Sequence, residues 1–230
     1  MAPLARLLSE NIGMIPVSPA AEPENFNERV RVRGNRFLRT NPNPSKEEWG
    51  KHSYWQDVLI DLWLRYHKVC AYSCHFIAAD TGVRSVDHFV SKHDDPVRAY
   101  EWSNYRLAAS RLNARKGRKK ILDPFEILPG TFGIHFPSLQ VVPGPLCKAD
   151  ANLRSRVVQT CDILGLNDET TCVTNRQNYV ETYCSGHCSF MYLRREAPFL
   201  AYELTAQGLV ELEAIRSIMT WPFKVDELLE

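Results

Sequence analysis

The spacing of four polar residues limits the folds open to this chain more than any other feature of its sequence. An Asp-His pair, Asp87 and His88, is followed by Asn104 and then by Asn113, in a basic segment that closes at Gly117. Carboxylate and amide oxygens are ligands for hard cations such as Mg²⁺. A neutral imidazole accepts a proton near pH 7. The set therefore predicts a metal-assisted site for phosphodiester hydrolysis.

The local sequence predicts how this set is held. Neighbouring residues of a strand point to opposite faces, so Asp87 and His88 serve one site only where the backbone bends. We therefore expect a strand that ends here and runs into the polar turn at 92–96. Asn104 is expected to hydrogen-bond the backbone and hold this loop in register. From Ser103 onward the pattern becomes helical and carries Asn113.

In residue type, order and spacing, this set resembles the ββα-metal finger of HNH endonucleases, in the variant whose last His is replaced by Asn. The resemblance covers about residues 66–127. It implies that Asp87 and Asn113 bind Mg²⁺ or Mn²⁺ and that His88 is the general base. It also implies that Asn104 is the middle Asn of the catalytic motif, tying the loop to the finger, and that Lys116 lies near the scissile phosphate.

The chain departs from this family at the zinc knuckle. Many HNH domains bind a structural zinc through two Cys pairs, and only Cys70 and Cys74 correspond loosely to the first pair. Ala109 and Leu112 occupy the slots of the second pair. Two thiolates do not complete a tetrahedral site, so we expect no structural zinc, apolar packing in its place, and two buried thiols.

A run of like charge overlaps the proposed finger. From Arg106 to Lys120 the chain has seven Lys and Arg residues and no acid. Solvated helix faces usually mix signs, so the run favours contact with phosphates. The expected nucleic-acid contacts are Arg111, Arg115, Lys116 and Arg118. A second cluster, between Arg29 and Arg39, reads as an edge strand or arm that contacts either DNA or a protein partner.

The chain as a whole predicts an α+β fold, with the finger embedded in a mostly helical single domain. Its 230 residues, 44% of them hydrophobic, suffice for one sizeable core. We expect an extended N-terminal arm at 1–45 and a nuclease domain at 46–230. The expected elements of that domain are a helix from a capping box at Ser45 to about Lys68, a ββα core at about 69–118, a β-rich stretch at about 121–145, and a helical region at about 149–220 with a break at 165–168 and a last helix at about 201–219.

The composition predicts the cellular compartment of the chain. Seven cysteines at irregular intervals suit a reducing cytoplasm better than a disulfide framework. The N-terminal residues lack an apolar run of secretory length, and no membrane-spanning segment is expected. The net charge of +1 leaves any attraction to nucleic acid to local patches. We therefore expect a cytoplasmic protein without a membrane partner.

Together these features predict an enzyme: a metal-dependent endonuclease acting on DNA with little sequence specificity. The flanking segments are similar to stand-alone HNH proteins of bacterial anti-phage systems, the HNH subunit of Septu-type systems among them, which implies a regulatory partner such as an ATPase. Two alternatives stay open, a non-catalytic DNA-binding or assembly subunit with an HNH shell and a nuclease that cleaves RNA such as tRNA. The sequence does not decide the partner, the trigger, the oligomeric state, or whether one strand or two is cut.

Overall fold

Where the sequence predicts a ββα finger, the structure has two antiparallel strands followed at once by a helix, and these three elements are called the finger below. In the computed structural model, which describes residues 17–219, β1 (Arg84–His88) pairs with β2 (Tyr105–Ala109). The register sets Asp87 opposite Arg106 and His88 opposite Tyr105. The chain then enters α4 (Ser110–Lys116), which ends at Gly117 with a φ of 51°. His88 is the last residue of β1, as the expected bend requires.

The expected extended arm is wrong where the structure describes it. A π-helical turn at Asn27–Arg31 leads directly into α1 (Val32–Thr40). Phe26, Val30 and Phe37 are buried, at intervals that place them on one face of a helix. Alternating Val and Arg imitated a strand, whereas this wider apolar spacing decides the structure. The rest of the predicted arm, residues 1–16, lies outside the described residues.

A close approach fixes α1 against the finger. A Cβ added at Gly34 would lie 2.1 Å from Cγ of the fully buried Tyr100. Only glycine therefore lets this ring pack on the helix backbone.

The segment from Ser45 begins as predicted but is not one helix. Ser45 and Glu48 form the capping box, with each side chain accepting the other residue's backbone N–H. The helix then breaks after Lys51. The pieces are α2 (Lys46–Lys51), a 3₁₀ turn at Tyr54–Val58 and α3 (Leu59–Arg65).

The C-terminal half is a small sheet and a series of helices. As predicted, the helical region breaks near Gly165, which has a φ of 66°, and Asp168 caps the turn that follows. The single last helix expected at 201–219 is wrong, since Gly208 interrupts it at a φ of 70°. The elements are β3 (Phe132–His135) paired with β4 (Gln140–Pro143), α5 (Ala151–Leu164), a π-helical turn at Glu169–Val173, α6 (Thr174–Cys184), α7 (Phe190–Glu196), α8 (Pro198–Ala206) and α9 (Leu212–Ile218), with short 3₁₀ turns at Pro96–Tyr100, Trp102–Asn104 and Pro145–Lys148.

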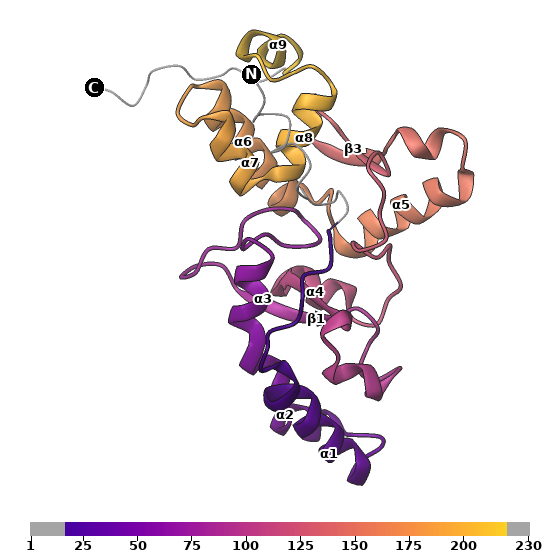
Figure 1. The fold of residues 1–230 in the computed structure, drawn as a ribbon. Coiled ribbons are helices and arrows are strands. Elements are labelled where there is room, and N and C mark those ends of the chain that lie inside the picture. Colours follow the sequence, from indigo (N-terminus) through magenta and orange to yellow (C-terminus); the bar gives the residue numbers. More distant parts are fainter. Residues whose placement is uncertain (1–16, 220–230) are drawn as a thin grey trace, which may run out of the picture.

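These elements place the finger in the middle of the molecule. Helices α1 and α2 lie at one end, α6 to α9 lie at the other, and α5 lies to one side (Figure 1). Helix α3 contacts both strands of the finger, and α4 contacts α5. One hydrophobic cluster runs through all these parts, so the fold is a mixed helix-and-sheet single domain with two small antiparallel sheets. Within 17–219 no helix has the length and apolar character needed to cross a bilayer.

Candidate active site

The end of β1 and the start of α4 border a cleft of about 500 Å³. Asp87 and His88 enter it from the strand and Asn113 enters it from the helix. A cleft of this size is typical of a ligand site. Its other lining residues are Trp55, Gln56, Ser85, Val86, Ser91, Lys92, His93, Ser110, Ala114, Gly117 and Arg118.

His88 is held in one orientation and one tautomer. Its Nε2 lies 3.0 Å from the carbonyl oxygen of Ala99. A carbonyl only accepts hydrogen bonds, so Nε2 carries the proton and Nδ1 keeps its lone pair. The edge of the imidazole also packs against Trp55, with ring centroids 4.6 Å apart. Burial, helped by the charge of Lys92, lowers the pKa of His88 to about 3, so the ring is neutral at physiological pH.

Asp87 is almost fully buried and already has partners. The hydroxyl of Tyr72 donates to its Oδ2, and Lys116 Nζ lies 3.1 Å from the carboxylate. Burial raises the pKa of Asp87 above its ordinary value, whereas the charge of Lys116 and the hydrogen bond from Tyr72 act to lower it. Lys116 itself is 1% exposed and also donates to the carbonyl of His88. This ammonium is therefore part of the interior: it pairs with Asp87, which lines the cleft, but does not line the cleft itself.

Asn113 is oriented by the strand opposite it. Its Nδ2 donates to Ser85 Oγ at 3.0 Å and to the carbonyl of Val86 at 3.2 Å. Both N–H bonds are thus used on the strand side, and the amide oxygen is the atom that can serve as a ligand.

Asp87 and Asn113 are the two residues of the cleft whose chemistry suits a Mg²⁺ or Mn²⁺ ion. Such ions are usually held by one or two protein oxygens, with water and substrate phosphate completing the shell. The pair supplies two hard oxygen donors on one cleft. No group of three His, Cys, Asp or Glu side chains within 17–219 is arranged for a metal, and the Asp–Asn pair is a set of a different kind. An ion here competes with Lys116 for the carboxylate of Asp87.

Asn104 does not line the cleft but ties the loop that follows His88. Its side chain accepts from the N–H of Val90 at 2.8 Å and donates to the carbonyls of Val90 and Arg98 at 2.9 and 3.0 Å. These are the backbone bonds that the sequence predicted for it. Asn104 therefore positions the backbone around His88 through hydrogen bonds to Val90 and Arg98.

The basic run has two kinds of residue. Arg111 and Arg115 pair with Asp168, joining α4 to the turn after α5. Of the four expected nucleic-acid contacts, only Arg118 lines the cleft. Lys92 also lies there and was missed, although its position in the polar turn just after His88 was a usable signal. Burial lowers the pKa of Lys92.

The four positions compared with a zinc knuckle, Cys70, Cys74, Ala109 and Leu112, lie in or against the hydrophobic core. Cys70 and Cys74 are both buried, and neither forms a disulfide. The Sγ of Cys70 accepts from the N–H groups of Tyr72 and Ala109, at 3.4 and 3.3 Å. Leu112 is buried in the core nearby.

Comparison with models of protein families finds no match to this chain, and no curated protein matches its sequence. The function of this protein is therefore inferred from its residues and their geometry.

Proposed function

We propose that this protein is a metal-dependent HNH endonuclease that hydrolyses DNA phosphodiester bonds with little sequence specificity. In this proposal β1, β2 and α4 are its ββα-metal finger. One observation carries the proposal: Asp87, His88 and Asn113 line a single cleft, and the Ala99 carbonyl leaves Nδ1 of His88 as a proton acceptor.

The residues of the cleft divide the reaction between them. His88 takes a proton from water at Nδ1, and the Ala99 carbonyl holds the ring and stabilises the imidazolium that forms. When bound by Asp87 and Asn113, Mg²⁺ or Mn²⁺ would supply positive charge for the developing phosphorane and the leaving oxygen. Lys92 and Arg118 lie where they can hold phosphate oxygens. Such backbone contacts position a strand without reading its sequence.

A second function has an observation of its own. The bonds from Tyr72 and Lys116 already satisfy Asp87, which favours a non-catalytic nucleic-acid-binding subunit that keeps the HNH shell. A third candidate, an RNA nuclease, uses the same groups on the same phosphate. Digestion of matched DNA and RNA strands with one preparation separates it from the first.

A cytoplasmic DNA nuclease needs control, because it would otherwise cut the DNA of its own cell. We propose an anti-phage defence complex as its setting, with a regulatory partner such as an ATPase. This part of the proposal is supported by the similarity of the flanking segments to Septu-type HNH proteins.

The test is nicking of supercoiled plasmid in Mg²⁺ or Mn²⁺. We expect wild-type protein to cut and His88→Ala to lose about 10²–10⁴-fold in rate, as removal of a general base does, with little change in DNA affinity. His93→Ala is the matched control, because His93 lines the same cleft but is exposed. Equal cutting by wild type and His88→Ala would exclude His88 as the base. Metal-independent binding without cutting by any of the three proteins would favour the non-catalytic subunit.

A further inference from the structure

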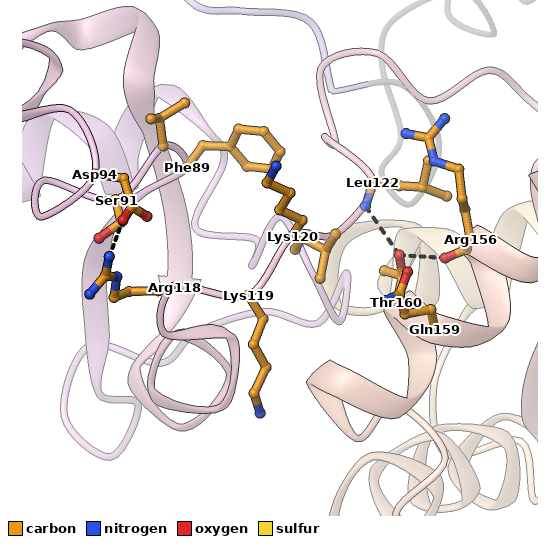
Figure 2. Close-up of a pocket in the computed structure, with 12 residues that line it drawn as sticks. Phe89, Ser91, Asp94, Arg118, Lys119, Lys120, Leu122, Arg156, Gln159 and Thr160 are labelled. Carbon is orange, nitrogen blue, oxygen red and sulfur yellow. Dashed lines mark hydrogen bonds and ion pairs between the residues drawn. The ribbon is translucent and has the colours of Figure 1, made fainter.

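A second hollow, of about 700 Å³, adjoins the candidate active site. The two share Ser91 and Arg118, so the hollow continues the cleft beyond the finger. One side comes from the loop after β1 and the other from α5 (Figure 2). The lining residues are Phe89, Val90, Ser91, Asp94, Arg118, Lys119, Lys120, Ile121, Leu122, Arg156, Gln159 and Thr160.

The charge of this hollow is strongly one-sided. Four cations, Arg118, Lys119, Lys120 and Arg156, face a single carboxylate, Asp94, which pairs with Arg118. All four cations are exposed. Figure 2 shows Lys119 and Lys120 leaving their segment in different directions, with Arg156 across the hollow on α5. The site is therefore suited to an anion with more than one charged group.

Much of the rest of the wall of this hollow is apolar. Phe89, Val90, Ile121 and Leu122 supply apolar surface, and Phe89 comes directly after His88. Leu122 is fixed to α5, since its N–H donates to Thr160 Oγ1 at 3.1 Å while that hydroxyl donates to the carbonyl of Arg156 at 2.8 Å. These two bonds thus tie the apolar side of the hollow to α5, the helix that carries Arg156.

The combination of an aromatic ring, apolar side chains and cations is the one that binds unpaired nucleic acid. In a duplex the bases are stacked inside and reach a protein wall only after extrusion. A phosphate backbone alone would satisfy the cations but would leave the partly exposed side chains of Phe89, Val90 and Ile121 uncovered.

We propose that this hollow binds the nucleotide next to the scissile phosphate, in an unpaired strand. Lys120 and Arg156 hold its phosphate, and its base packs against Phe89 and Leu122. The inference rests on the proposed nuclease function and adds its substrate class: single-stranded or locally unpaired nucleic acid.

The test is fluorescence anisotropy of a labelled 12-residue oligothymidylate with the full chain in EDTA, where metal-dependent cutting does not occur. We expect Lys120→Gln/Arg156→Gln to bind about tenfold more weakly at 100 mM salt. The slope of log affinity against log salt should fall by about 0.7, the share of the one single-strand phosphate that Lys120 and Arg156 hold together. The matched control is Lys148→Gln/Arg154→Gln, two exposed cations on the neighbouring pocket, which should stay within about twofold of wild type.

The contact between the base and the apolar wall is tested by comparing two strands, one with bases and one without. An abasic strand of equal charge should bind wild type at least about fivefold more weakly than oligothymidylate, as loss of one stacked base predicts. Wild-type affinity in the Lys120→Gln/Arg156→Gln protein would overturn the proposal. Equal binding of the two strands, or tighter binding of a duplex of equal charge, would also overturn it.

Plasmid nicking on the same preparations separates this inference from the nuclease function. If wild type cuts plasmid but the double variant binds oligothymidylate normally, the hollow is not the subsite and the nuclease stands. If no protein cuts but the binding losses appear, the nuclease function fails and the hollow remains a single-strand site.

Discussion

The basic run changes character at Gly117. Before this residue every cation pairs with an acid elsewhere in the fold: Arg106 with Asp123 and Lys116 with Asp87 in the interior, and Arg111 and Arg115 with Asp168 nearer the surface. After it, Arg118, Lys119 and Lys120 are exposed and line a hollow. The two halves have similar composition, and the difference shows that a run of like charge forms an open cationic surface only where the backbone turns its side chains outward.

The largest expected effect comes from the inner half. Lys116→Met should lower the free energy of unfolding by about 3–5 kcal/mol, because it leaves the buried carboxylate of Asp87 without its cation. Urea unfolding measures it. Lys119→Met is the matched control and should stay within about 0.5 kcal/mol of wild type. Equal, small losses of unfolding free energy in both variants would contradict the difference between the cations before and after Gly117.

A second change of the inner half should cost somewhat less. Arg106 donates to Asp123 at 2.6 and 2.8 Å and is 4% exposed. Arg106→Met should lower the unfolding free energy by about 1.5–3 kcal/mol, the range for hydrogen bonds to charged groups. Arg111→Met, which removes an exposed pair with Asp168, should cost less than about 1 kcal/mol. A larger cost for Arg111→Met than for Arg106→Met would reverse the assignment of these arginines.

The buried interior also predicts a response to acid. Burial lowers the pKa of His75 and of His88 to about 3, against about 6.5 in an unfolded chain. As pH falls from 6.5 towards 3, these two histidines bind protons in the unfolded chain but stay neutral in the folded chain. Stability is therefore full above pH 6.5 and falls below it, by up to about 1.4 kcal/mol per pH unit for each histidine.

Urea unfolding at pH 7 and pH 5 measures this slope. His75→Gln should reduce this slope by the contribution of one histidine, up to about 1.4 kcal/mol per pH unit. His135→Gln, at an exposed position, should leave it unchanged. A slope that His75→Gln does not alter would mean that His75 binds its proton equally well in the folded and unfolded chains, against the lowered pKa.

The smallest effect on stability is expected in the outer half. Arg118→Gln removes an exposed pair with Asp94 and should cost about 0.2–1 kcal/mol. The same variant should weaken plasmid binding and flatten its salt dependence by about 0.9, the share of one phosphate contact on a duplex. Normal salt dependence in Arg118→Gln would place the outer cations away from nucleic acid.

Local signals in the sequence predicted much of what surrounds the site. The capping box at Ser45, the strand end at His88 and the loop bonds of Asn104 each follow from chemistry within a few residues. The spacing of Asp87, His88 and Asn113 likewise anticipated that they would meet on one cleft.

What the sequence did not predict depends on distant contacts. Lys116 before a glycine reads as an ordinary helix end, and nothing local shows that its side chain turns inward to Asp87. Arg156 joins the hollow only because α5 packs beside the finger. The helix at 27–40 was missed because alternating Val and Arg imitated a strand, while its buried face depends on contact with Tyr100.

The most direct test of the account is binding of Mn²⁺, followed by electron paramagnetic resonance of the free ion. We predict that wild type and His88→Ala bind one ion, that Asp87→Asn and Asn113→Ala lose about tenfold or more in affinity, and that only wild type cuts plasmid. That pattern would assign metal binding to Asp87 and Asn113 and proton transfer to His88. Equal Mn²⁺ affinity in all four proteins, or none in wild type, would contradict a metal site at this cleft.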